Sequence, residues 1–230
     1  MHGRPLTDDP KRLDAKDDAG AGRPRRKRLS SDERREEFIA KAIEFFAQQG
    51  FESSTRALAR QLGVTQPLLY RYFPSKGDLI AEVYDRIYVK RWRAEWSDLL
   101  ADRSKPVRAR LVEFYAAYTD VVFHDDWMRI FLFSGLKGAD INRRYMKLVR
   151  ARILEPILRE HRHESGMDGL EPTDEEVEFA WIMHGGIFYY GVRTLIYEAS
   201  VLNNKAFVIE SSIDAFLGQL PKVRAAAEAG

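Results

Sequence analysis

The chain of 230 residues contains no cysteine, so disulfides, thiolate metal sites and cysteine nucleophiles are all excluded. It also lacks any uninterrupted apolar run long enough to span a bilayer. The N-terminal twenty residues lack the apolar stretch that secretory signals have. We therefore expect a soluble, cytoplasmic protein, and the lack of cysteine fits a reducing compartment.

Negative charge is missing from one stretch, residues 53–77, which contains no Asp or Glu. Over the whole chain acids and bases nearly balance, at 35 and 37, and the net charge is only +2. Any affinity for nucleic acid must therefore come from where the charges lie. The stretch suits a polyanion, because its charged residues are all basic: Arg56, Arg60, Arg71 and Lys76.

Strand-like alternation, internal repeats and sustained heptads are also missing, and apolar residues recur at helical spacing instead. The sequence therefore predicts an all-α fold. The first helix begins at Ser30 or Ser31 and ends at Gly50. The second begins at Ser54 or Thr55. A turn follows at 63–64. The third helix is capped by Thr65 and has Pro67 in its first turn. The fourth helix is capped by Ser75 and runs toward Trp96.

Helical spacing continues through the rest of the chain, with Pro, Asp and Thr residues at the expected starts. A capping sequence begins at Thr173 and introduces a long apolar helix to about Ser200. The other expected helices cover 106–123, 127–136 after Asp125 or Asp126, 140–161, and 205–217.

Composition divides the chain into four parts. Residues 1–29 mix charged residues with Gly and Pro and should be disordered. Residues 30–77 form a small helical domain, 78–222 a larger one, and 223–230 a disordered tail. Arg25 and Arg26 belong to a basic cluster that is either a solvated tail or an arm lying along DNA beside the small domain. A nuclear localisation signal also fits its composition.

The stretch TRALARQLGVTQPLLYRYFPSK, which begins at Thr55, predicts a helix-turn-helix. Two short helices flank Gly63, where a tight turn favours the positive φ that glycine adopts without strain. In such a motif the second helix enters the major groove of DNA.

These residues resemble the tetracycline-repressor (TetR-like) family of bacterial transcription regulators. The matching features are Gly50-Phe51, LGVT at 62–65, LYRYF at 69–73 and PSK at 74–76. They cover about a fifth of the chain, and the helix order and total length also fit. The resemblance implies DNA binding, dimerisation through the C-terminal domain and control by a small molecule, with repression as the commoner outcome.

The resemblance implies that Leu69 and Phe73 face inward and hold the third helix on its two partners. It also assigns roles in DNA binding. Gln66 can pair with an adenine edge, and Tyr70 and Tyr72 offer hydroxyls to phosphates. Lys76 adds its ammonium to the free amides of the fourth helix. Thr55 and Arg56 can touch the flanking backbone, whereas Arg60 and Arg71 can be long-range charge only. The predicted DNA-binding set is Thr55, Arg56, Thr65, Gln66, Pro67, Tyr70, Arg71, Tyr72 and Lys76, with Arg25 and Arg26 from the arm.

The larger domain contains the second set of candidates. The helix after Thr173 is apolar over most of its circumference, and Gly185, Gly186 and Gly191 allow close approach of another helix. With the last helix it predicts a four-helix dimer interface. Aromatic residues are dense and suit a hydrophobic or aromatic effector, although most of them also fit an ordinary core. The candidate ligand-binding residues are Tyr118, Trp127, Phe131, Trp181 and Phe188, with Arg129 and His184 to orient an anionic group.

No sequence motif supports catalysis or a cofactor. His161 and His163 are two residues apart and point to different sides of a helix, and no carboxylate lies at convincing metal-ligand spacing. No phosphate-binding glycine loop or nucleophile elbow is present. We expect no enzyme, no metal and no cofactor. A helix-turn-helix that serves only as a protein-interaction module remains the alternative to a DNA-binding regulator.

Overall fold

The computed structural model describes residues 29–136 and 140–228, and within those ranges every regular element is helical. The all-α expectation is confirmed. The expected arm at 1–29, with Arg25 and Arg26, lies outside the described residues except for Leu29. No helix in the described part of the chain is both long enough and apolar enough to cross a bilayer.

Three short helices follow a longer one at the N-terminal end: α1 (Ser31–Gln49), α2 (Thr55–Gln61), α3 (Gln66–Tyr72) and α4 (Lys76–Tyr84). Their starts are fixed by side-chain caps. Ser30 forms a capping box with Glu33 at the start of α1. Ser54, rather than Thr55, caps α2. Thr65 and Ser75 cap α3 and α4 as expected.

The core of this region is built from the apolar faces of all four helices. Leu58 of α2 is fully buried, and Leu69 and Phe73 are 1% and 2% exposed, as the sequence predicts. Arg35 of α1 lies over the Phe73 ring at 5.2 Å and pairs with Glu82 of α4 at 2.6 Å. The contacts join α1, α3 and α4 and fix the orientation of α3.

The fourth helix differs from its expected course. The α-helix ends at Tyr84 and continues as a π-helical turn, η1 (Asp85–Val89). The chain then leaves helical geometry before α5 (Glu95–Ala101) begins, so Trp96 lies on a separate helix. The prediction of one helix to Trp96 is wrong because hydrophobic spacing does not reveal such a local change of helical register.

The larger region contains the remaining helices: α6 (Val107–Val122), α7 (Asp125–Leu136), α8 (Asp140–Val149), the π-helical turn η2 (Arg150–Leu154), α9 (Glu155–Glu164), α10 (Asp174–Leu195) and α11 (Lys205–Glu228). Thr173 and Glu176 form the expected capping box of α10. That helix ends five residues before the expected Ser200.

The last helix continues well beyond its expected end at Leu217, through Pro221 and into the segment 223–228 that the sequence predicts to be disordered. Its end is anchored by side chains that composition alone does not reveal. Leu220 is fully buried, and Arg224 pairs with the buried carboxylate of Glu176 at 2.9 Å. These contacts hold the end of α11 in place, although the composition of this alanine-rich segment alone predicts disorder.

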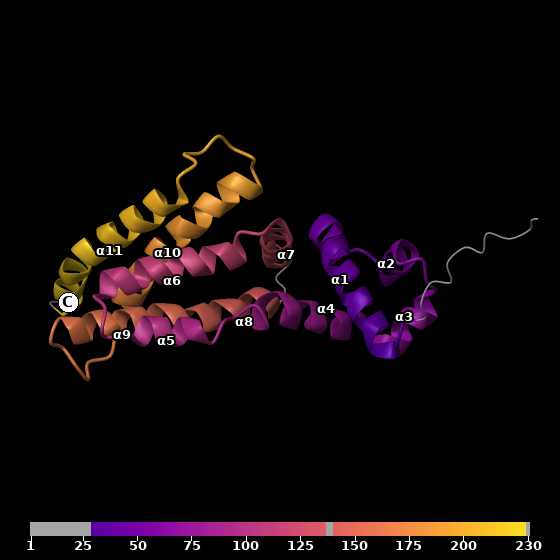
Figure 1. Cartoon of the computed structure of the whole chain (residues 1–230), viewed down its shortest axis with the longest axis horizontal. Coiled ribbons are helices and arrows are strands. Elements are labelled where there is room, and N and C mark those ends of the chain that lie inside the picture. The colour runs from indigo at the N-terminus through magenta and orange to yellow at the C-terminus, as the bar shows by residue number, and fades with distance from the viewer. Residues whose placement is uncertain (1–28, 137–139, 229–230) are drawn as a thin grey trace, which may run out of the picture.

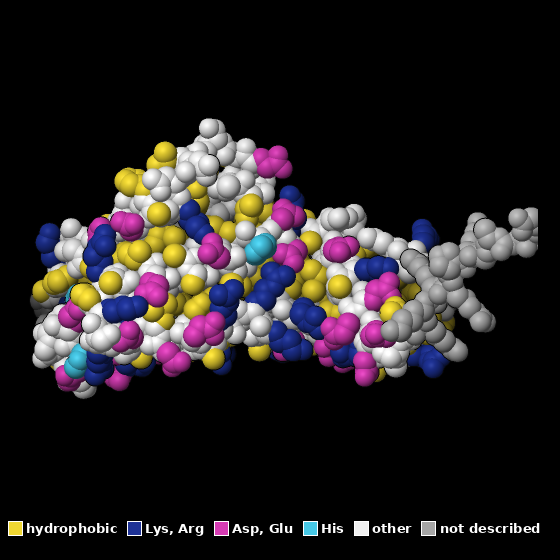
Figure 2. Space-filling model, viewed as in Figure 1, with side chains coloured by type: hydrophobic (Ala, Val, Ile, Leu, Met, Phe, Trp, Pro, Cys, Tyr) yellow, Lys and Arg dark blue, Asp and Glu magenta, His cyan; other side chains and the backbone are white. Residues whose placement is uncertain are grey.

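The helices form an elongated molecule with α1, α2 and α3 at one end (Figure 1). From these three, α4 leads into the larger region, while α7 packs against α1 and provides a second connection. At the other side of the molecule α10 and α11 pack against each other. Acidic and basic side chains are interspersed over the visible face of the larger region (Figure 2).

Candidate nucleic-acid interface

Three side chains that the sequence predicts to bind DNA are hydrogen-bonded to one another. The Gln66 amide Nε2 donates to Thr55 Oγ1 at 2.9 Å, and the Tyr70 hydroxyl lies 3.0 Å from the same oxygen. Thr55 is only 8% exposed, whereas Tyr70 is 38% exposed. The first residue of α2 therefore supports two side chains of α3 from beneath.

This network changes the role expected of Thr55. A hydroxyl that is almost fully buried beneath Gln66 and Tyr70 does not face the flanking DNA backbone. Its oxygen accepts the Gln66 N–H, and its own proton can go to Tyr70. In that arrangement the Gln66 carbonyl oxygen and the Tyr70 O–H proton both stay available for an outside partner.

The start of α3 is open to solvent. Thr65 and Pro67 are exposed, and Gln66 between them is half-buried. Next to Gln66 lies a shallow depression of about 400 Å³ between α2 and α3, lined by Arg56, Ala59, Arg60, Val64, Gln66 and Pro67. Arg56 and Arg60 are exposed on its α2 side, so the depression offers positive charge without a carboxylate.

The far end of α3 carries the remaining basic and aromatic candidates. Arg71 is exposed, and Tyr72 packs edge-to-face on Phe38 of α1 at 5.2 Å, which leaves it half-buried. Lys76 is the first residue of α4 and is also half-buried. Gln66, Tyr72 and Lys76 thus each keep a solvent-exposed part, as DNA binding requires.

The predicted ligand-binding residues form two parts of one aromatic cluster. Trp127 and Phe131 stack at 5.2 Å, and Phe188 contacts Phe131 at 5.5 Å. His184 lies 5.6 Å from both Tyr118 and Trp181. Arg129 is not among them, because it pairs with Asp125 at 2.8 Å near the molecular surface.

His184 does not have the expected anion-orienting character. Burial lowers its pKa from 6.5 to about 4, so the ring is neutral at pH 7. Its Nδ1 lies 3.2 Å from the Tyr115 hydroxyl, which satisfies it within the core. A neutral, internally bonded imidazole offers an anion no charge.

The centre of this cluster is tightly filled, with a cavity of only about 10 Å³. Several of its lining residues were not among the predicted candidates: Tyr88, Arg91, Trp92, Trp96 and Tyr145. The sequence does contain a signal for them, since Trp92 and Trp96 lie four residues apart just after the fourth helix. That signal is concealed if the stretch is treated as the continuation of one long helix.

A metal site finds no support in the described residues, because no three His, Asp or Glu side chains gather closely enough to hold an ion there. His161 and His163 lie in the last turn of α9, which runs three residues beyond the predicted end at 161. His163 pairs with Asp168 at 2.6 Å.

Comparison with known proteins links this geometry to a family. Residues 38–83 match the model of the N-terminal domain described as bacterial regulatory proteins, tetR family. The matched residues include all of α2 and α3 and most of α1 and α4. The family so described consists of regulatory proteins rather than enzymes. No curated protein matches the chain.

Solved structures share the fold over most of the chain. A TetR-like transcriptional regulator from Rhodococcus sp. RHA1 is similar with a TM-score of 0.62 at 17% identity, covering 84% of this chain and 97% of that one. A TetR family transcriptional regulator from Pseudomonas syringae pv. tomato DC3000 gives 0.58 at 24% identity, over 82% and 97%. AmtR from Mycobacterium smegmatis gives 0.55 at 18%, over 90% and 98%. At these identities the likeness concerns the fold.

Proposed function

Because residues 38–83 carry the N-terminal domain of the tetR family of bacterial regulatory proteins, we propose that this chain is a DNA-binding transcriptional regulator. It binds a palindromic operator as a homodimer and acts as a repressor. A small hydrophobic or aromatic effector, bound in the larger helical region, releases it from DNA. A regulator of this kind works in the bacterial cytoplasm, where the chromosome is.

The observation that carries the DNA-binding part is the surface formed by α2 and α3. It contains no carboxylate from residue 53 to 77, and its exposed side chains include Arg56, Arg60 and Arg71. Gln66 lies at the N-terminal end of α3, where recognition helices contact base edges. Its amide is held by Thr55 and so has a defined orientation.

Selection of bound fragments from genomic DNA, followed by titration of the selected fragments at several salt concentrations, tests this proposal. Affinity should fall steeply as salt rises, since binding releases counterions from the phosphates. Gln66→Ala should lose sequence discrimination. The control is Lys147→Gln, which removes an exposed charge on α8 and should bind DNA as the parent does. Equal affinity for selected and random fragments would contradict a specific regulator.

The dimer is proposed from an uncovered apolar face on α10 and α11. Ile182 and Tyr189 of α10 are 66% and 52% exposed, and Phe207 of α11 is 57% exposed. A groove of about 320 Å³ between the two helices is lined mainly by apolar groups, among them Phe179, Met183, Gly186 and Phe216. A Cβ at Gly185 or Gly186 would meet no atom within 4 Å, so this face is open to a second copy.

Sedimentation of the full chain and its variants tests the dimer. Ile182→Glu places a charge in the middle of the apolar face and should shift the protein toward monomer. Leu202→Glu is the matched control, because Leu202 is 61% exposed in the connection between α10 and α11. A parent that sediments as a monomer at concentrations well above those that saturate DNA would refute the two-fold proposal.

A further inference from the structure

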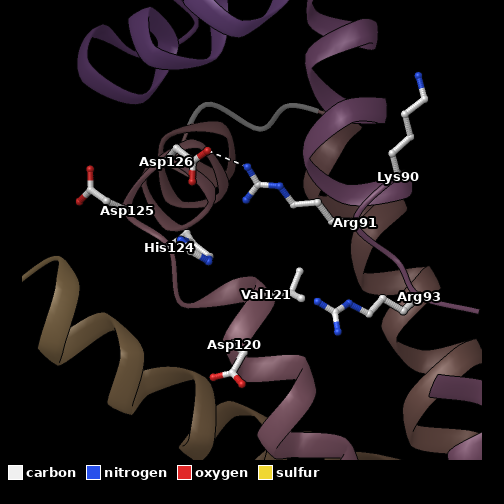
Figure 3. A pocket seen from close by; sticks show the side chains of 8 residues that line it. All are labelled: Lys90, Arg91, Arg93, Asp120, Val121, His124, Asp125 and Asp126. Atoms are coloured by element: carbon white, nitrogen blue, oxygen red, sulfur yellow. Dashed lines mark hydrogen bonds and ion pairs between the residues drawn. The ribbon is translucent and has the colours of Figure 1, made fainter. Parts of the chain in front are cut away.

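A cleft of about 660 Å³ lies where α4 and η1 enter the larger region (Figure 3). Its walls come from the stretch after η1, the C-terminal end of α6 and the start of α7. The volume is in the range of small-molecule sites. The lining residues are Lys90, Arg91, Arg93, Asp120, Val121, His124, Asp125 and Asp126.

The carboxylates of this cleft are already paired, and one cation is not. Asp125 pairs with Arg129, Asp126 pairs with Arg91 at 2.8 Å, and Asp120 binds Lys205. The Arg93 guanidinium makes no ion pair with any residue that the structure describes. Figure 3 shows Arg91 and Arg93 extending into the space between the helices, while Lys90 points away from it.

The small cavity of the aromatic core adjoins the cleft, because Arg91 and Val121 line both. Two donors in the wall of that cavity, the Tyr88 hydroxyl and Trp96 Nε1, find no hydrogen-bond partner among the described residues. Both residues are only 2% exposed. Burial raises the pKa of Tyr88, so its hydroxyl stays protonated and remains a donor.

Buried donors without partners are costly, and two in one wall indicate that an acceptor belongs there. Trp92 lines the same cavity. It is half-buried, lies in the non-helical stretch before α5, and has the Arg152 guanidinium over its ring at 5.3 Å.

We propose that this cleft and the cavity beneath it form the effector site, and that the effector is an organic acid with one carboxylate and a hydroxyl or carbonyl oxygen on an apolar body. The proposal rests on the proposed function and specifies its ligand. The carboxylate pairs with Arg93 and Arg91. The body lies in the cleft along Val121, and only its oxygen reaches the cavity of about 10 Å³, where it accepts from Tyr88 and Trp96.

The same site explains how binding would reach the DNA-binding helices. The Arg91–Asp126 ion pair ties the stretch after η1 to α7. The DNA-binding helices connect to the larger region through α4 and through the packing of α1 on α7. A carboxylate that competes with Asp126 for Arg91 loosens the link between these two connections, and so changes the position of α3.

The first experiment measures binding of para-hydroxyphenylacetate, para-hydroxycinnamate and phenylpyruvate to the full chain by tryptophan fluorescence. Each acid is paired with its uncharged amide. At least one acid should bind at least about tenfold more tightly than its amide, since the amide cannot pair with the arginines. Arg93→Gln should weaken that acid by about tenfold, and Lys90→Gln should leave it within about twofold, because Lys90 points out of the cleft.

A second variant tests the orphaned donors. Tyr88→Phe removes a hydroxyl that has no partner, so the protein should stay folded in thermal unfolding. It should also lose the preference for para-hydroxyphenylacetate over phenylacetate. A preserved preference in Tyr88→Phe would remove Tyr88 from the site and overturn the acceptor requirement.

DNA binding measured on the same preparations distinguishes failure of the ligand inference from failure of the proposed function. If the chain binds selected DNA, the ligand inference is overturned by any of three results: no acid binds up to about 1 mM, each amide binds as well as its acid, or Arg93→Gln has no effect. If an acid binds as described but no DNA is bound, the regulator proposal fails and the ligand site stands. Lower affinity for DNA in the presence of the bound acid is the result expected of both.

Discussion

At the scale of single residues, the buried hydroxyl of Thr55 connects two side chains of the proposed DNA-binding surface, those of Gln66 and Tyr70. Gln66 lies where base edges are expected, and Tyr70 lies where a phosphate is expected. One hydroxyl holds both, because it accepts from the Gln66 amide and shares a hydrogen bond with the Tyr70 hydroxyl. Under the proposed function, Thr55 therefore orients the recognition residues without itself reaching the duplex.

This role predicts opposite results for two similar substitutions. Thr55→Val keeps the shape but removes the hydroxyl, which frees the Gln66 amide to rotate and leaves Tyr70 without its partner. Affinity for the selected operator should fall by about tenfold, equivalent to about 1.4 kcal/mol, with most of the sequence discrimination lost. Thr55→Ser should retain both. Anisotropy titrations on selected and random fragments distinguish them, and equal discrimination by Thr55→Val and the parent would refute the role.

Gly63 has a different kind of constraint, which lies in its backbone. Its φ is +68°, and a Cβ there would meet no atom within 4 Å. Gly63→Val should therefore reorient α3 through backbone strain of about 1–2 kcal/mol or more, and not through a clash. DNA binding should be abolished, while the melting temperature should fall by only about 2–8 °C. Gly63→Asn, which tolerates positive φ, should keep binding, and loss of binding in both variants would point to another cause.

At the scale of helices, much of the fold follows from the sequence. The caps at Thr65, Ser75 and Thr173 lie where short polar residues precede apolar helical spacing, so they are visible without a structure. The end of α11 is not visible, because it depends on a distant pairing between Arg224 and Glu176. The change to π-helical geometry at η1 cannot be predicted either, because apolar residues keep their helical spacing through it.

The candidate sites follow the same division. Gln66 and Tyr70 were predicted from a local motif, and their shared partner needed the packing of α2 on α3. Arg91 and Arg93 were not predicted, because their surroundings come from α6 and α7, which lie about 30 residues away along the chain. Distant contacts of this kind leave no local pattern in one sequence.

Gly191 shows how closely two helices of the larger region approach. A Cβ there would lie 2.6 Å from the ring of Phe123, at the end of α6. The group that approaches Gly191 closely therefore belongs to the same chain. Gly191→Ala should destabilise the protein by about 1–3 kcal/mol through overpacking, less the roughly 1 kcal/mol that alanine contributes to a helix.

The same substitution in a Phe123→Ala protein tests whether contact with the Phe123 ring causes the loss of stability. With Phe123→Ala the ring is absent, and adding Gly191→Ala should then stabilise the protein. Urea unfolding of the four proteins in the cycle measures the coupling. If Gly191→Ala has the same effect in both backgrounds, contact with Phe123 does not explain the glycine.

At the scale of the whole molecule, two connections link the DNA-binding end to the larger region, one along α4 and η1 and the other between α1 and α7. Buried residues of both regions form one continuous core. Stability and DNA binding should therefore respond together to changes deep in the larger region. Protonation of His184 is such a change, because the ring is buried among Tyr115, Tyr118 and Trp181.

The sign of the pH effect follows from the direction of the pKa shift. The pKa of His184 is about 4 in the folded protein, because burial disfavours the charged ring, and 6.5 is its ordinary value. Between these values the unfolded chain binds a proton that the folded chain does not, so stability falls as the pH is lowered from about 6.5 toward 4. From pH 7.5 to 5.0 this one group should remove about 2 kcal/mol from the free energy of unfolding.

His184→Gln keeps an acceptor for the Tyr115 hydroxyl and does not titrate, so it should show a correspondingly smaller loss of stability over the same range. Burial also lowers the pKa of His161, but that group titrates equally in both proteins and cancels in the comparison. Urea unfolding at fixed protein concentration measures the difference, because dimerisation would make stability concentration-dependent. Identical pH dependence in the two proteins would mean that His184 is protonated, or exposed to water, in the native state.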